Sequence, residues 1–351
     1  MACPESDPVA ARRDWPLRRM IISRTPFRVS FFGGGTDYPA WYREHGGAVL
    51  STSINKYSYV TCRYLPPYHD FKYLIRYYKR EEAQTVDEIQ HPSVRACLKF
   101  MELDGGVDIV HHADIPARSG LGSSSTFTVG LLHALYALKH EMPSKRQLAL
   151  NAIHIEQDLI KESVGSQDQT NAAFGGFNRI DFGGDHEILV KPLILRPDRL
   201  ERLQQHIMLF FTGLARTASE VAGEQINNIP SKKRDLAQMI QSVDDAEKIL
   251  LEPGDRLEDF GHMLHEQWLV KRGMSSQVTN SHIDAIYEAG IKTGALGGKL
   301  LGAGGGGFMM FFAPPERQPG IRAALQPLLY VPARFDFLGS QIIYFHKDDV
   351  N

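Results

Sequence analysis

The chain has 351 residues and a formal net charge of −2, and 43% of its residues are hydrophobic, which is ample for two packed domains that share a cleft. This small net charge gives no electrostatic reason to expect nucleic acid or a membrane surface as a partner. The three cysteines lack the spacing of metal ligands and predict reduced thiols in a cytoplasmic protein. No apolar run approaches the roughly 20 residues that a membrane span needs.

The chain is expected to begin with a tail and then strands. Residues 1–19 lack the apolar core of a signal peptide and predict a loose tail. Strands are predicted in 20–32, ahead of the turn Gly33-Gly-Gly35. Further strands are predicted in 48–63, where apolar and polar residues alternate and many side chains are β-branched.

Helices enter in the next part of the chain. A short helix is predicted over 93–103, and a strand at 107–110 leads to a long apolar helix over 127–138. Ser144 with Gln147 forms a capping-box pattern, so another helix is expected to begin there. Its buried stripe is expected to contain Leu148, Ala152, Ile155 and Leu159.

The pattern changes near residues 190–200, where two prolines interrupt it. A strand over 206–212, long helical stretches and a last strand over 308–312 follow. We therefore predict an α+β fold with two lobes, an N-terminal lobe of residues 20–195 and a C-terminal lobe of residues 196–351.

A glycine- and serine-rich loop connects the strand at 107–110 to the long helix. Its sequence is Pro116-Ala-Arg-Ser-Gly-Leu-Gly-Ser-Ser-Ser125. Glycine allows the backbone to approach a ligand closely, and the start of a helix carries about half a positive charge. The loop could be a capped turn only, but its chemistry also suits a phosphate group.

A second glycine loop occurs near the C-terminus, Lys299-Leu-Leu-Gly-Ala-Gly-Gly-Gly-Gly-Phe308. Gly302, Gly304 and Gly307 satisfy the G-x-G-x-x-G spacing of dinucleotide sites, which requires a strand before the loop and a helix after it. Here a helical stretch is expected before the loop and a strand after it. This order excludes a nicotinamide oxidoreductase of the usual kind. Four successive glycines instead predict backbone amides close to an anion.

Three charged side chains match the needs of phosphoryl transfer. Such a reaction uses a magnesium ligand, a group that orients or deprotonates the attacking hydroxyl, and a cation for the developing charge. Glu156, Asp168 and Arg28 offer these three functions. Either acid taken alone is more simply explained as a solvated surface carboxylate.

Taken together, these motifs resemble those of the galactokinase, homoserine kinase, mevalonate kinase and phosphomevalonate kinase (GHMP) superfamily. Gly120-Leu-Gly-Ser-Ser-Ser125 is similar to its phosphate-binding motif, and the segment Pro26-Phe-Arg-Val-Ser-Phe-Phe-Gly-Gly-Gly-Thr-Asp37 to its N-terminal motif. The second glycine loop is similar to its C-terminal motif. The resemblance covers most of the chain from Met20 onward and implies a two-lobed fold with ATP and substrate in the cleft.

The resemblance also implies roles for individual residues. Asp168 matches the catalytic aspartate, and Arg28 stands where relatives carry a cation that faces the transferred phosphate. Ser124 and Glu156 match the Mg²⁺ ligands. The ATP-binding positions are Pro116, Arg118, Ser119, Gly120, Leu121, Gly122, Ser123, Ser124 and Ser125, and the substrate-binding positions are Gly34, Gly35, Thr36, Asp37, Gly304, Gly305 and Gly306.

The N-terminal motif narrows the choice of sugar substrate. Galactokinase-like members have Gly-Glu-His-Thr-Asp where this chain has Gly33-Gly-Gly-Thr-Asp37, which argues against galactose. This sequence, with Ile54-Asn-Lys-Tyr57 and Ala117-Arg-Ser-Gly120, is similar to the branch of D-glycero-D-manno-heptose 7-phosphate kinases, which phosphorylate the anomeric hydroxyl. Fucose and other long-chain sugar phosphates stay open as substrates. A catalytically silent ligand sensor stays open as an alternative function. The sequence does not specify an oligomeric state.

If the substrate already carries a phosphate, the protein needs basic residues to bind that distal phosphate. The sequence offers seven candidates without showing which of them converge: Arg24, Lys56, Arg63, Arg118, Lys271, Arg272 and Lys299.

Overall fold

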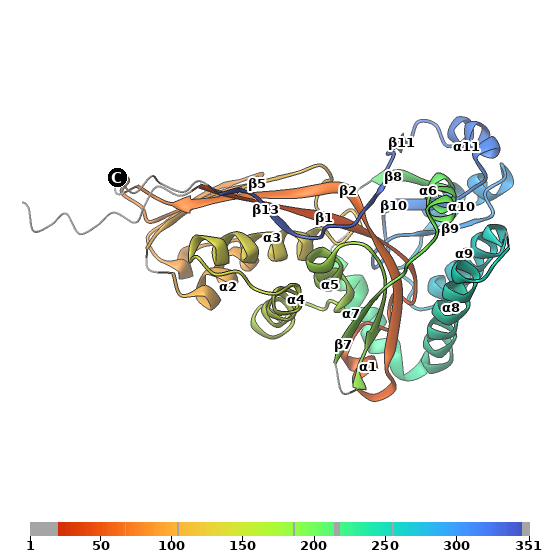
Figure 1. The fold of residues 1–351 in the computed structure, drawn as a ribbon, viewed down its shortest axis with the longest axis horizontal. Helices are drawn as coiled ribbons and strands as arrows, with labels where there is room; N and C mark the ends of the chain where they lie inside the picture. The colour runs from red at the N-terminus through yellow and green to blue at the C-terminus, as the bar shows by residue number, and fades with distance from the viewer. Residues whose placement is uncertain are drawn as a thin grey trace, which may run out of the picture.

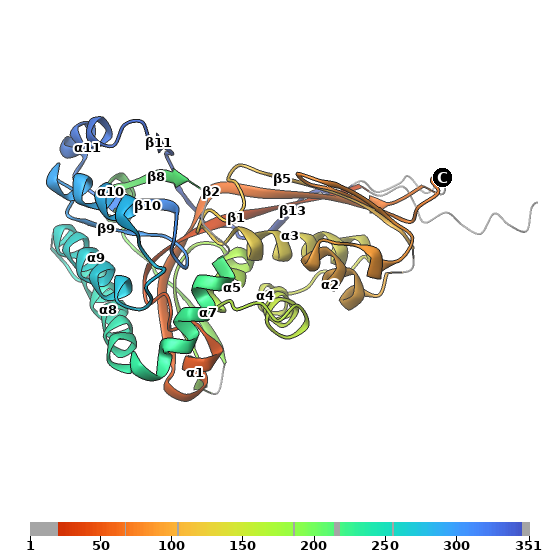
Figure 2. The same cartoon turned by 180° about the vertical axis from the view of Figure 1, so that it is seen from behind.

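The structure is a computed structural model that describes residues 20–66, 68–103, 105–184, 187–213, 218–254 and 256–345. The expected tail, residues 1–19, lies outside these ranges. The described residues form an α+β fold with two sheets and flanking helices, as Figures 1 and 2 show from opposite sides.

The larger sheet is built on two long antiparallel strands, β1 (Met20–Phe32) and β2 (Gly47–Tyr64). Each is one continuous strand, where the sequence predicted several, because no turn interrupts either run. Irregular register after Pro26 and after Ser30 marks bulges, which bend strands. Both strands curve downward where they approach the second lobe (Figure 1). The order is β13-β1-β2-β5-β3-β4, with β6, β7 and β12 joined at the other end of β2.

The remaining elements of this half are short. The other strands are β3 (Tyr73–Arg76), β4 (Arg80–Ala83), β5 (Val107–Ala113), β6 (Phe177–Phe182) and β7 (Ile188–Pro192). The helices are α1 (Pro39–His45), α2 (Pro92–Met101), α3 (Ser123–Leu138), α4 (Lys145–His154) and α5 (Gln167–Phe174). Helices α2 to α5 lie on one face of the sheet (Figures 1 and 2).

Helix α3 forms the centre of this lobe. All its residues from Ser125 to Leu138 are buried, which explains why its sequence is apolar all round. The predicted cap of α4 is confirmed, since Ser144 Oγ accepts a hydrogen bond from the amide of Gln147 at 3.1 Å. The predicted stripe is correct except at Leu159, which is 47% exposed. A π-turn over Ile155–Leu159 widens the helix there and rotates Leu159 away from the core.

The smaller sheet belongs to the second lobe and has the order β11-β8-β10-β9. These strands are β8 (Ile207–Gly213), β9 (Gly297–Leu300), β10 (Gly307–Phe312) and β11 (Leu329–Tyr330). The helices are α6 (Pro197–Gln205), α7 (Ala218–Asn228), α8 (Lys233–Leu251), α9 (Leu257–Arg272), α10 (Ser281–Lys292) and α11 (Gln318–Ala324). Helices α8 and α9 run side by side along this lobe (Figure 2).

Strand β9 corrects the expectation of a helical stretch directly before the second glycine loop. Gly297 and Gly298 conceal the strand in the sequence, yet close packing requires both. An added Cβ would lie 2.0 Å from the carbonyl oxygen of Gly261 at Gly297, and 2.3 Å from that of Met310 at Gly298. Since strand β10, not a helix, follows the loop, the Rossmann arrangement is absent here.

The two-lobe division differs from the expected boundaries at the C-terminal end. Strands β12 (Phe335–Asp336) and β13 (Gln341–Phe345) return to the larger sheet and pair with β2 and β1. The chain therefore passes between the two lobes twice, first from the N-terminal to the C-terminal lobe near Leu193 and then back again after β11. No helix among the described residues has the length and apolar character to cross a membrane.

Candidate active site

A cavity of about 750 Å³ is lined by residues from both lobes. Its size falls in the range of small-molecule sites. The first lobe contributes the serine loop (116–125), Asp168, and residues that follow β1. The second lobe contributes Ala222, Gln225 and Lys271 from its helices, Lys299 from β9, and Gly302 with Ala303 from the second glycine loop.

The serine loop presents the start of helix α3 to this cavity. Gly120 and Gly122 have φ angles of +80° and +79°, which suit glycine, and the helix begins at Ser123. Of the positions expected to bind ATP, seven line the cavity: Pro116, Arg118, Gly120, Gly122, Ser123, Ser124 and Ser125. Ser119 and Leu121 are fully buried and do not line it.

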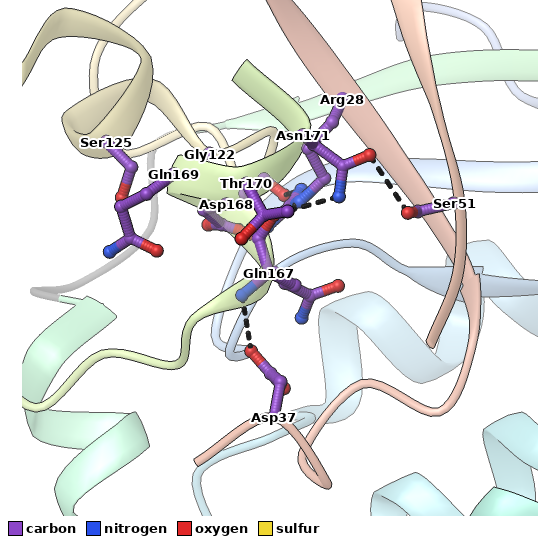
Figure 3. Close-up of polar contacts among 12 residues, drawn as sticks. Arg28, Asp37, Ser51, Gly122, Ser125, Gln167, Asp168, Gln169, Thr170 and Asn171 are labelled. Atoms are coloured by element: carbon purple, nitrogen blue, oxygen red, sulfur yellow. Dashed lines mark hydrogen bonds and ion pairs between the residues drawn. The ribbon is translucent and has the colours of Figure 1, made fainter. Parts of the chain in front are cut away.

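Arg28 and Asp168 form a two-point ion pair at the wall of the cavity. Arg28 Nε lies 2.7 Å from Asp168 Oδ1, and the second bond, from Nη2 to Oδ2, is 2.8 Å. Arg28 Nη1 also donates to the carbonyl oxygen of Gly120 at 2.7 Å. Asp168 lies in the first turn of α5 (Figure 3), and its side chain is 25% exposed, against 4% for Arg28. The pair therefore fixes a carboxylate that stays reachable from the cleft.

Gly122 lies directly against this pair (Figure 3). A Cβ on Gly122 would lie 3.2 Å from Asp168 Oδ2 and 3.4 Å from Arg28 Cγ. The absence of a side chain thus allows the serine loop and the ion pair to occupy neighbouring positions. This contact joins the expected phosphate site to the expected catalytic residues.

Glu156 is fully buried in the π-turn after α4. Its carboxylate accepts hydrogen bonds from Ser125 Oγ and Thr128 Oγ1, each at 2.7 Å, and from the side-chain amide of Gln169. Burial raises the pKa of Glu156 to about 7, although these hydrogen bonds act in the opposite direction.

The carboxylate oxygens of Glu156 and the nearby serine hydroxyl oxygens suit Mg²⁺, which prefers oxygen ligands and commonly uses one or two carboxylates. No lysine or arginine in the described part of the chain lies within ion-pair distance of Glu156, so a cation would complement its charge. Ser124 is exposed and lines the cavity, whereas Ser125 connects the cavity to Glu156. Ser124, Ser125 and Glu156 could together supply the ligands; the sequence missed this bridging position of Ser125.

The raised pKa of Glu156 makes stability depend on pH. Because the folded-state value exceeds the ordinary 4.5, this group stabilises the fold fully below pH 4.5, and that contribution is lost as pH rises through about 7. Glu156→Gln removes the titration. The unfolding free energy of the wild type minus that of the variant, from urea denaturation without metal, should therefore fall between about pH 5 and about pH 8. A difference that stays constant would contradict the assignment.

The segment after β1 separates into lining and packing residues. Gly34, Gly35 and Asp37 line the cavity. Gly33 does not line it and instead packs against β2, where an added Cβ would lie 1.9 Å from the carbonyl oxygen of Ala48. Thr36 is fully buried and donates to main-chain oxygens.

Asp37 has a fixed and buried carboxylate. It accepts hydrogen bonds from the amide of Gly35 at 2.9 Å and from that of Gln167 at 3.3 Å, the second shown in Figure 3. Burial raises its pKa, and the charge of Asp168 adds to that effect. Asp37 therefore lies close enough to Asp168 for the two carboxylates to interact, as acceptors on the same cleft.

The second glycine loop packs against the serine loop. A Cβ at Gly302 would lie 2.5 Å from Gly120 Cα, and one at Gly307 would lie 2.3 Å from the carbonyl oxygen of Ser119. Gly302 and Ala303 line the cavity, whereas the expected substrate positions Gly304, Gly305 and Gly306 do not. The amide of Gly305 donates to the carbonyl oxygen of Val278 at 3.1 Å. Close packing explains Gly302, Gly304 and Gly307, whereas Gly305 and Gly306 have φ angles of +80° and +150°, which suit glycine.

The structure distinguishes among the seven candidate basic residues. Arg118, Lys271 and Lys299 line the cavity, whereas the other four do not. Arg24 donates to Gln341, and Arg63 and Arg272 pair with Asp108 and Asp284.

Several cavity residues had no signal in the sequence. Tyr77 and Tyr78 from the turn between β3 and β4, Gln90 and His91 from directly before α2, and Phe127 from α3 line the cavity, and the rings of Tyr77 and Phe127 pack against that of His91. Ser30 and Gln167 also line it, each with a buried side-chain oxygen that has no hydrogen-bond partner among the described residues. Gln167 adjoins Asp168, a position that the sequence could have suggested.

Comparison with known proteins agrees with this arrangement. Residues 92–176 match the N-terminal domain of GHMP kinases, and residues 244–329 match their C-terminal domain. The chain thus matches both domains of GHMP kinases, and these matches together with the kinases among its relatives indicate a phosphotransferase that uses an alcohol group as acceptor.

Individual relatives narrow the comparison. The chain is 29% identical over 337 residues to a D-glycero-alpha-D-manno-heptose 7-phosphate kinase of Campylobacter jejuni, covering 88% of this chain and 94% of the relative. It is 25% identical to a bifunctional fucokinase/GDP-fucose pyrophosphorylase of Arabidopsis thaliana, but spans only 30% of that protein. A crystal structure described as a D-glycero-D-manno-heptose 1-phosphate kinase from Bacteroides thetaiotaomicron matches with a TM-score of 0.75 and 25% identity, over 92% of this chain and 99% of that one.

Proposed function

We propose that the protein is an ATP-dependent sugar kinase that phosphorylates the anomeric hydroxyl of D-glycero-D-manno-heptose 7-phosphate and yields the 1,7-bisphosphate. The observation that carries the proposal is the convergence of the serine loop, the Arg28–Asp168 pair and Asp37 on one cavity. Two relatives that this chain matches over nearly their whole length are described as heptose phosphate kinases, although their names place the substrate phosphate at different positions.

The parts of the cavity correspond to the parts of the reaction. The amides at the start of α3 suit the phosphates of ATP, and the packed rings of Tyr77, Tyr78 and His91 suit its base. Ser124, Ser125 and Glu156 would hold Mg²⁺, which neutralises charge on the phosphates when it is bound. The acceptor sugar would lie beside Asp37, Gly34 and Gly35.

Asp168 would orient the attacking hydroxyl. Both of its oxygens accept from Arg28, so the carboxylate is held in one orientation. Arg28 in turn stands where charge grows on the transferred phosphoryl group. The catalytic effect would combine alignment of the hydroxyl with electrostatic stabilisation, which supply most of the catalysis in phosphoryl transfer.

Substrate preference tests the proposal. With ATP and Mg²⁺ fixed, kcat/KM should be at least about a hundredfold higher for the heptose 7-phosphate than for the free heptose or fucose, since two charge-assisted hydrogen bonds contribute about 3 kcal/mol or more. Comparable values for fucose would favour a fucokinase. ATP binding without consumption of any sugar would favour a silent sensor.

A further inference from the structure

Two buried lysines of the second lobe stand out in the wall of the cavity. Lys271 lies near the end of helix α9 and Lys299 lies in strand β9, and their exposed fractions are 7% and 2%. Both line the cavity. Lysine is rarely buried to this extent without a carboxylate partner.

Neither ammonium has such a partner within the described ranges. Lys271 Nζ donates to the carbonyl oxygens of Leu300, at 3.0 Å, and of Gly302. Lys299 Nζ donates to the carbonyl oxygen of Phe31 at 2.9 Å. An ammonium has three donors, so each lysine keeps at least one free for a ligand.

The electrostatics of the pair agree with a missing anion. Burial lowers the pKa of Lys271 to about 7, and the charge of Arg28 lowers it further, against smaller raising effects of Asp37 and Asp168. Burial also lowers the pKa of Lys299 well below its ordinary value, with Lys271 and Arg28 acting in the same direction. A dianion beside these lysines would restore their charged forms.

We infer that Lys271 and Lys299 together hold the phosphate group that the sugar substrate already carries. Their position supports this choice over the phosphates of ATP, which have the helix start and Arg28. Lys299 donates to the carbonyl oxygen of Phe31, three residues before Gly34. Both lysines interact with the charge of Asp37 as well as with that of Arg28. They therefore border the acceptor side of the cavity, next to Arg28. The inference rests on the proposed function and names the residues that select its substrate.

Substitution by methionine tests the inference. Lys271→Met and Lys299→Met keep the length of the side chain, and replacing a buried charge by an apolar group commonly preserves folding. Each should reduce the preference for heptose 7-phosphate over free heptose by about tenfold to a hundredfold, the loss of one charge-assisted hydrogen bond. The KM for ATP should change less than about threefold. Lys248→Met, on the exposed face of α8, is the matched control and should leave the preference as it is.

Inorganic phosphate provides an independent readout. It should inhibit the wild type competitively against heptose 7-phosphate, and Lys271→Met should weaken that inhibition. An equal loss of activity with both sugars, or a large rise in the KM for ATP, would show that the lysines serve the transferred phosphoryl group and would overturn the inference. The proposed function fails separately, if the wild type already shows no preference for the phosphorylated sugar. If one variant does not fold, the other decides between these results.

Discussion

Asp168→Asn is expected to reduce kcat by about 10²–10⁴ while the affinity for ATP changes little. The asparagine has the same shape but places an amide donor against Arg28, whose Nε and Nη2 now donate to the two carboxylate oxygens at 2.7 and 2.8 Å. The variant would lose the carboxylate that can accept the proton of the sugar hydroxyl, and with one acceptor oxygen replaced by a donor it would also lose the orientation of Arg28. The ATP phosphates would still meet the serine loop.

Steady-state kinetics with heptose 7-phosphate, combined with calorimetric titration of ATP, measures both effects. Asp245→Asn, on the outer face of α8, is the control for removal of one carboxylate and should keep wild-type kinetics. Turnover of Asp168→Asn near that of the wild type would remove Asp168 from the mechanism.

Gly122→Val is expected to weaken ATP binding by at least about tenfold and to abolish most turnover. The new Cβ would approach Asp168 Oδ2 and Cγ at 3.2 and 3.3 Å, closer than most side-chain contacts. A φ of +79° adds strain, which costs a β-branched residue about 1–2 kcal/mol. Relief of either effect would move the serine loop away from the position in which we propose that it holds the phosphates of ATP.

The control for this variant is Gly184→Val. Gly184 has a similar φ of +72°, but its added Cβ meets nothing within 4 Å. It reproduces the backbone strain without the contact with Asp168. Equal ATP affinity in a folded Gly122→Val variant and in the wild type would mean that the loop does not hold phosphate.

Local sequence patterns were sufficient for much of the fold. Alternation of apolar and polar residues predicted the region of β2, the run ahead of Gly33-Gly-Gly35 was predicted as strand where β1 lies, and the serine cap predicted the start of α4. Strand β9 was hidden, because its glycines are required by contact with α9 and with the next strand, β10, and no local pattern shows these contacts. The return of β13 to β1 was hidden for the same reason, since pairing between chain ends leaves no local pattern.

The candidate site also contains residues that the sequence could predict and residues that it could not. The serine loop, Arg28 and Asp168 lie within short motifs, so the sequence could group them before their contact was known. The bridge from Ser125 to Glu156 and the two buried lysines depend on tertiary packing. A lysine has the same sequence signature on a solvated surface as in a cleft, and only the fold shows that Lys271 and Lys299 converge while Arg63 and Arg272 pair elsewhere.

The proposed reaction transfers a phosphoryl group to the anomeric oxygen of a sugar that already carries a phosphate. Phosphorus NMR of a mixture of the protein with heptose 7-phosphate, ATP and Mg²⁺ follows this transfer directly. We expect a sugar product with two phosphorus signals, one of them coupled to the anomeric proton, formed together with ADP. A sugar phosphate that remains unchanged, or a new phosphate coupled to any other position of the sugar, would contradict it.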